Sequence, residues 1–154
     1  QGYLDVVRAL LAANGIQANQ ARDTGVTPLF IACQEGHVDV VRALLGVDGI
    51  QANQAQTTTG CTPLFQACQE GHLDVVRALL GADGIQANQA NQKSQTPINM
   101  ASFMGHVDVV RVLLSVPGID IATADQWGDT PLQSALKKGH SGVVSLLQEH
   151  SQST

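Results

Sequence analysis

The chain has 154 residues and a formal net charge of -5, and it is 44% apolar but only 3% aromatic. With only eight Lys and Arg residues, it lacks the clustered cations that a phosphate backbone requires, which argues against nucleic acid as a partner. No apolar run approaches the roughly 18 residues that span a bilayer, so we expect no membrane contact. The three cysteines form an odd number without a disulfide framework, which indicates a reducing compartment and an intracellular, cytoplasmic location.

The first predicted helix lies at the N-terminus, where the chain starts inside a pattern that recurs later. Residues 1–7 resemble residues 35–41, which stand in the middle of a later unit. We therefore expect residues 1–21 to be a partial repeat in a fragment of a longer protein. Without a preceding helix the apolar face of this first helix would be exposed, which predicts fraying or weak self-association at this end. The residues of that face are Val6, Val7, Leu10 and Leu11.

The next unit contains the pattern in full. Thr27 and Pro28 predict a helix start, because Thr caps free N–H groups and Pro is tolerated at the first helical position. Gly36 predicts the end of this short helix in a positive-φ conformation. Residues 38–45 then have apolar side chains at helical spacing, which predicts a second helix with one buried face. Polar residues follow it and predict an extended loop with a projecting hairpin tip.

The start of this unit recurs at spacings of 35, 34 and 34 residues. The recurring helix starts are Thr27, Thr62, Thr96 and Thr130. A unit of this size cannot bury its apolar face alone, so self-similarity at this period predicts a stacked solenoid. We expect residues 1–154 to form a single domain. After the partial repeat it would contain full repeats over 22–55, 56–90 and 91–124, and a C-terminal repeat over 125–154.

The order of these landmarks resembles the ankyrin repeat. The shared features are a Thr-Pro-Leu start, a Gly-His turn, a Val-Val-x-x-Leu-Leu second helix and a Gly-Ile-x-x-Asn exit, and they cover nearly the whole chain. The resemblance implies an all-α repeat solenoid of stacked helix-turn-helix units with projecting β-hairpin-like loops. It also implies a non-enzymatic protein-protein interaction module without a cofactor, which binds a protein or a peptide on its concave face.

Several residues depart from the ankyrin pattern. The His that usually follows Thr-Pro-Leu is replaced by Phe30, Phe65, Asn99 and Gln133. An additional residue within 57–59 predicts one longer tip, and Ser94 replaces a loop Gly. The Asn at the end of the loop is Ala122 in the fourth unit, which predicts a missing hydrogen-bonded link between adjacent loops.

Two Cys-x-x-x-His pairs invite a metal or catalytic interpretation. They are Cys33 with His37 and Cys68 with His72. A zinc site needs three or four converging ligands, whereas these pairs recur only because the repeat does. We therefore predict no metal site and no catalytic residue, and the resemblance implies a structural role for the His.

Candidate partner-binding residues stand at two kinds of position. By analogy with ankyrin repeats, the two residues before each turn Gly line the concave groove, and the loop tips border it. Along the stack the groove would change from acidic, through apolar, to basic. The candidates are Glu35, Glu70, Phe103, Met104, Lys137 and Lys138 in the groove, with Trp127 and Lys93 on tips. Alternatively, Trp127 only shields the neighbouring tip, and Lys137 and Lys138 only make a hydrophilic cap.

Other functions are compatible with the same sequence. The array could be a structural spacer within a longer repeat protein, in which no surface cluster would matter to a partner. It could be the targeting domain of a fused enzyme, with the chemistry outside this segment. A further possibility from the resemblance is hydroxylation of the recurring loop Asn, here Asn19, Asn53 and Asn88.

Overall fold

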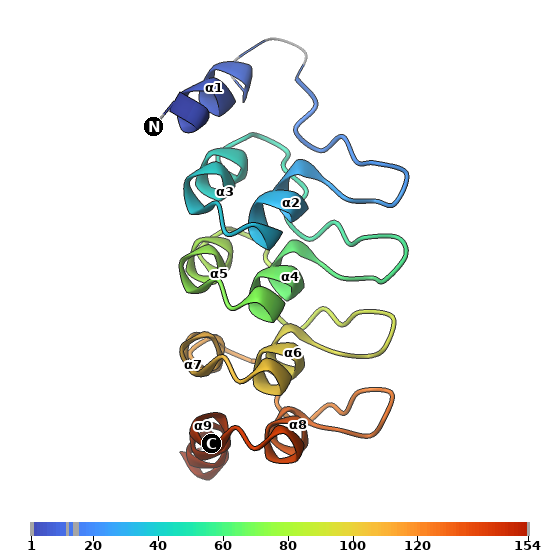
Figure 1. The fold of residues 1–154 in the computed structure, drawn as a ribbon, viewed down its shortest axis with the longest axis vertical. Helices are drawn as coiled ribbons and strands as arrows, with labels where there is room; N and C mark the ends of the chain where they lie inside the picture. The colour runs from blue at the N-terminus through green and yellow to red at the C-terminus, as the bar shows by residue number, and fades with distance from the viewer. Residues whose placement is uncertain (1, 12, 14–15, 154) are drawn as a thin grey trace.

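The computed structural model describes residues 2–11, 13 and 16–153, and within them it contains nine α-helices and no strand (Figure 1). The helices are α1 (Gly2–Leu11), α2 (Pro28–Gln34), α3 (Val38–Leu45), α4 (Pro63–Glu70), α5 (Leu73–Leu80), α6 (Pro97–Met104), α7 (Val107–Leu114), α8 (Pro131–Lys138) and α9 (Ser141–Ser153). The predicted all-α repeat solenoid is therefore confirmed.

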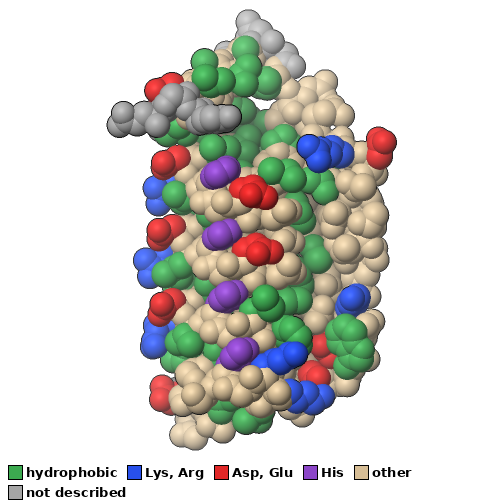
Figure 2. Space-filling view, viewed as in Figure 1, with side chains coloured by type: hydrophobic (Ala, Val, Ile, Leu, Met, Phe, Trp, Pro, Cys, Tyr) green, Lys and Arg blue, Asp and Glu red, His purple; other side chains and the backbone are tan. Residues whose placement is uncertain are grey.

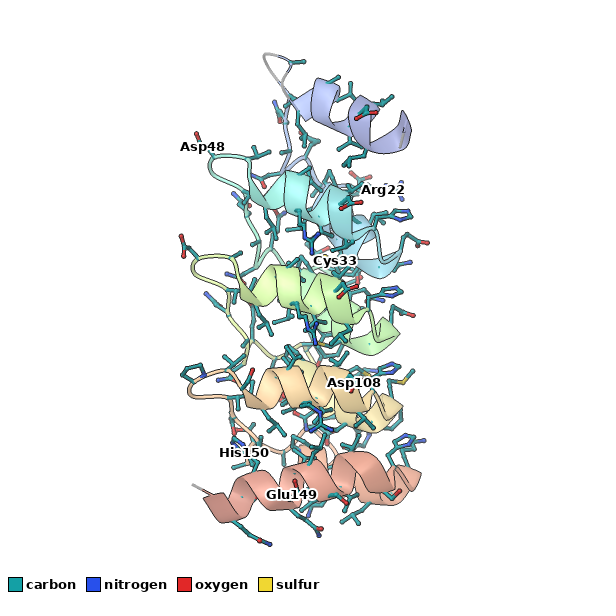
Figure 3. All side chains as sticks on the ribbon, turned by 90° about the vertical axis from the view of Figure 1, so that its left-hand side faces the viewer. Arg22, Cys33, Asp48, Asp108, Glu149 and His150 are labelled. Carbon is teal, nitrogen blue, oxygen red and sulfur yellow. The ribbon has the colours of Figure 1, made fainter. Side chains whose placement is uncertain are left out.

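The helices form two stacked layers. In the inner layer α2, α4, α6 and α8 pack in order, and in the outer layer α1, α3, α5, α7 and α9 do the same (Figure 1). Figure 3 looks onto the outer layer, where Asp108 lies on α7 and Glu149 on α9. The loops between units project from the inner layer on the side away from the outer helices (Figure 1). The loop tips and the inner helices together therefore form one continuous surface of the stack.

Each inner helix starts at the predicted Thr-Pro step. The Thr27 hydroxyl accepts a hydrogen bond from the Phe30 N–H at 3.1 Å, and Thr62 accepts from Phe65 in the same way. At Thr96 the cap is reciprocal, because the Asn99 side chain also accepts from the Thr96 N–H. Such caps satisfy N–H groups that have no partner inside the helix.

The recurring histidines join consecutive units. His72 Nε2 lies 3.0 Å from the Gln34 carbonyl oxygen, His106 Nε2 lies 2.9 Å from that of Gln69, and His140 Nε2 lies 3.0 Å from that of Phe103. Each ring therefore bonds to a carbonyl near the end of the preceding unit's helix. This contact gives the His the structural role that the resemblance implied.

The recurring asparagines join consecutive loops. Asn53 donates from Nδ2 to the Gly84 carbonyl at 2.8 Å and accepts from the Gln86 N–H at 2.9 Å. Asn19 and Asn88 make the same two bonds to the loops that follow them. The missing link predicted at Ala122 stays a prediction, because its partner loop would belong to a further unit. Each Asn bonds to the loop of the next unit, and no such loop follows α9 within the described residues.

The tips are turns closed and joined by backbone hydrogen bonds. Arg22 N–H donates to the Val26 carbonyl, and equivalent bonds close the tips at 56–61, 91–95 and 125–129. The second tip has one more residue, as predicted. One backbone hydrogen bond joins each pair of neighbouring tips, for example from the Gln126 N–H to the Lys93 carbonyl at 3.0 Å. The tips therefore form a continuous row along one edge of the stack.

Ser94 keeps the backbone conformation of the Gly that it replaces. Its φ is 56°, whereas Gly25, Gly60 and Gly128 have φ between 74° and 82° at the matching positions of the other tips. A side chain with Cβ is disfavoured in this left-handed region. We expect Ser94→Gly to raise the free energy of unfolding by about 1 kcal/mol, since strain relief exceeds the entropy that Gly adds to the unfolded chain. Urea denaturation checks this; an equal or lower midpoint would contradict it.

The core runs the length of the stack between the two layers. Its largest fully buried side chains include Leu64, Leu79, Ile98 and Leu113. A second cluster lies between the inner helices and the tips, where Phe30, Phe65 and Cys61 are buried together. The two Phe residues that replace the usual His therefore fill space beneath the tips, and this explains why aromatic residues are acceptable there.

The first helix exposes only part of its apolar surface. Val6 is 58% exposed and Leu10 is 52% exposed, as predicted. Val7 and Leu11 are half-buried instead, and Leu11 packs against the core. The prediction that all four are exposed is wrong for these two, because α1 packs on α3 and covers that side.

Candidate partner-binding face

One surface of the solenoid carries all the residues that the sequence marked as candidates. We call it the inner face and define it by the tips at 22–26, 56–61, 91–95 and 125–129 with the C-terminal ends of α2, α4, α6 and α8. In Figure 2 a column of histidines runs down this side of the stack. Acidic side chains lie beside the upper histidines, whereas hydrophobic and basic side chains lie beside the lower ones. The predicted change in character along the stack is visible there.

Phe103 and Met104 form an apolar patch at the end of α6. Phe103 is 38% exposed and Met104 is 44% exposed, although they end a helix whose other face is fully buried. The Lys138 ammonium lies 4.3 Å from the centre of the Phe103 ring, so a cation from the end of α8 covers it. The Phe103 carbonyl accepts the bond from His140, which fixes the backbone behind the ring.

Trp127 projects from the last tip and is 58% exposed. The tip is ordered by Asp125, whose carboxylate accepts from the N–H groups of Trp127 and Asp129, both at 3.0 Å. Lys93 on the preceding tip places its ammonium 5.6 Å from the centre of the indole ring. The ring is thus held by its backbone and by a neighbouring cation, while most of its surface remains free.

Lys137 differs from the other two lysines because it has an ion-pair partner. Its ammonium lies 2.6 Å from the Asp129 carboxylate, whose side chain is only 17% exposed. Lys137 is thereby tied to the base of the last tip. The sequence did not predict this pair, since the two residues are eight positions apart, with Asp129 in the tip before α8 and Lys137 in the last turn of that helix.

Glu35 and Glu70 stand at the other end of the inner face. Both are exposed, and the Glu70 carboxylate accepts from the Gln66 and Gln69 amides at 2.9 and 3.0 Å. Glu35 accepts from the Gln34 amide at 3.2 Å. Neutral amides position these carboxylates without neutralising their charge, so the inner-face ends of α2 and α4 are acidic.

Leu136 was not among the predicted site residues, but it is 54% exposed. The matching positions in the preceding units are Cys33, Cys68 and Ser102, each fully buried and each on a helix that packs against a following inner helix. No inner helix follows α8 within the described residues, so Leu136 lies at the end of the stack. The exposure of Leu136 could have been predicted from the sequence, because its position in the repeat is a buried one and no further inner helix follows it in the described chain.

Other features of the described surface offer no comparable site. An open depression between the ends of α3 and α5 is lined by residues that include Arg42, Ile50, Arg77 and Asp83, and it lies outside the inner face. In the described part of the chain, no three His, Cys, Asp or Glu side chains converge as metal ligands. Over the same residues, none of the helices is long and apolar enough to cross a bilayer.

The buried cysteines predict a specific response to alkaline pH. Burial raises the pKa of the Cys33 thiol from 9.0 to about 12, and it also raises the pKa of Cys68, where Cys33 contributes a smaller increase. The thiol ionises at a higher pH in the folded state than in the unfolded state. The buried neutral thiol therefore contributes fully to stability below pH 9, and this contribution is lost as the pH rises toward 12.

The variant Cys33→Ala/Cys68→Ala should therefore lose less stability than the wild type between about pH 9 and pH 12. At neutral pH it should be less stable, because it loses two buried sulfur atoms. Urea denaturation across this range measures both effects. The prediction would be contradicted if the free energy of unfolding fell equally with pH in the two proteins.

Comparison with known proteins agrees with the repeat pattern. A family model described as "Ankyrin repeats (3 copies)" matches residues 1–91 and again residues 84–154, which together cover the chain. A search of curated proteins gives no significant match.

Proposed function

The chain belongs to the ankyrin repeat family, and from this premise we propose that its inner face binds another protein or an extended peptide. Ankyrin repeats are generally protein-protein interaction modules and are typically non-enzymatic. The three cysteines are free thiols, which supports our proposal of an intracellular, cytoplasmic location.

The observation that carries this proposal is that two aromatic rings, Phe103 and Trp127, are both exposed and held in place. Neither ring is needed to fill the core, yet each is ordered by backbone bonds and covered by a lysine. Rigid aromatic side chains provide large contact area at low entropic cost and are enriched at interface hot spots. Both lie on the same end of the inner face, so one partner can contact both.

Met104 makes a direct test possible because the chain has only two methionines. Met104 is 44% exposed on the inner face, whereas Met100 is half-buried against the cluster beneath the tips. With both replaced by photo-methionine in cells, illumination should cross-link the partner through position 104. The adduct should disappear in Met104→Leu and persist in Met100→Leu. An adduct that persists in Met104→Leu would place the partner contact away from position 104, and the lack of any adduct would instead favour the spacer function.

A second proposal concerns α1, whose Val6 and Leu10 side chains are exposed side by side at helical spacing. We propose that this face supports weak self-association. The variant Val6→Glu/Leu10→Glu should remain monomeric at concentrations where the wild type begins to dimerise, as sedimentation equilibrium measures. Identical association of the two proteins would contradict the role of α1.

A further inference from the structure

We propose that the partner of the inner face is an extended peptide with a basic segment, an apolar centre and an acidic segment, in that order from α2 toward α8. This inference rests on the proposed function and adds the chemistry of the ligand. Three features of the inner face support it: two lysines without carboxylate partners, a partly exposed apolar patch at Phe103 and Met104, and two glutamates without cationic partners.

The acidic segment follows from the lysines. All three lysines of the chain belong to this end of the inner face. Lys137 is neutralised by Asp129, whereas among the described residues Lys93 and Lys138 form no ion pair and instead lie over aromatic rings. An ammonium above a ring still has N–H donors available, and it can bind a carboxylate of the partner while an apolar side chain packs against the ring.

The apolar centre follows from Phe103 and Met104, which lie between the acidic and basic ends of the inner face. Met is flexible and polarisable, and so accommodates several apolar side chains. The ring beside it contributes a rigid surface. One or two apolar residues of the peptide would therefore pack here.

The basic segment follows from Glu35 and Glu70. Their carboxylates accept only from neutral Gln side chains, so the described structure leaves both negative charges without a cation. A Lys or Arg of the partner would find an ordered acceptor there. The acidic segment is excluded from this end by like-charge repulsion, and this repulsion fixes which end of the peptide lies where.

The repeat geometry gives a spacing rule for the peptide. Glu35, Glu70, Met104 and Lys138 occupy the same position in successive units. Packed helices lie roughly 8–10 Å apart, so Glu70 and Lys138, two units apart, are separated by about 16–20 Å. An extended chain rises about 3.3 Å per residue, so the basic and acidic residues that they bind stand about five or six positions apart.

A random twelve-residue peptide library, selected on the immobilised protein, tests this inference. Wild type should enrich peptides with Lys or Arg, then apolar residues, then Asp or Glu at this spacing. The variant Lys93→Glu/Lys138→Glu should bind the selected peptides at least about tenfold more weakly, since it replaces attraction by repulsion. Selection on that variant should enrich Lys or Arg where wild type enriches Asp or Glu.

The variant Arg42→Glu/Arg77→Glu is the matched control, because it changes the net charge equally but acts on exposed residues of the outer helices α3 and α5. It should select the same peptides as wild type. Selected peptides without the charge order would overturn the inference; if they also require Phe103 and Trp127, the proposed function itself stands. Peptides that bind Phe103→Ala/Trp127→Ala as well as wild type would contradict both. A selection that enriches no peptide would overturn the inference, leaving the cross-link through Met104 as the test of the proposed function.

Discussion

Gly71→Ala should lower the free energy of unfolding by about 3 kcal/mol, far more than the same substitution at Gly139. Both glycines end an inner helix with φ of 75°. A Cβ at Gly71 would lie 2.7 Å from the His106 ring, whereas a Cβ at Gly139 would meet nothing within 4 Å. Gly71→Ala therefore combines backbone strain with displacement of a ring that joins two units through the Gln69 carbonyl.

Gly139→Ala isolates the backbone strain and should cost only about 1 kcal/mol. A double-mutant cycle with His106→Ala separates the two effects: without the ring, Gly71→Ala should cost no more than Gly139→Ala. Urea denaturation of the five proteins, wild type included, provides the comparison. Equal costs for Gly71→Ala and Gly139→Ala in the wild-type background would contradict the predicted displacement of the His106 ring.

Phe103→Ala/Trp127→Ala should weaken partner binding by about 1,000-fold, because each truncation removes an aromatic contact worth about 2 kcal/mol at a hot spot. Both side chains are largely outside the core, so helicity should be unchanged. Once cross-linking through Met104 has identified the partner, isothermal titration calorimetry with the free partner measures the loss of affinity. Circular dichroism checks that the fold is unchanged.

Leu136→Ala is the control for lost apolar surface. Leu136 is 54% exposed, comparable to Trp127, but it lies at the end of the stack. Its truncation should change the affinity less than about twofold, in line with near-neutral residues outside a hot spot. Unchanged affinity in the double alanine variant, or an equal loss in Leu136→Ala, would contradict the proposed binding face.

The architecture could be predicted from the sequence because each landmark has a local physical cause. Thr62 caps α4, and Gly71 ends it in the left-handed region, in both cases through interactions within a few residues. The repetition of such local signals then predicts the stack. The extra residue in the second tip followed from counting alone.

Contacts between units were harder to predict, because sequence shows which residues recur but not which neighbour each one meets. The loop Asn bonds forward to the next unit, so Ala122 breaks no described link. The pairing of Lys137 with Asp129 depends on how a long side chain lies along α8. The half-burial of Val7 and Leu11 depends on the packing of α1 against α3.

For the candidate site, the sequence predicted the positions but not their local environment. Phe103, Met104 and Trp127 are exposed, as a binding face requires. The lysines above the two rings emerge only in the structure, because they bring together residues from different units. These contacts, unlike the positions alone, indicate the chemistry of a partner.

The central proposal, that the inner face is the binding surface, is tested most directly by nuclear magnetic resonance of the 15N-labelled protein. The titrant is the free partner, once it has been identified by cross-linking through Met104, or a peptide selected on the wild type. We expect the largest shifts at the Trp127 indole N–H and at the amides of Phe103, Met104 and Lys138. Shifts confined to the outer helices α3, α5 and α7, with the Trp127 signal unchanged, would contradict the proposal.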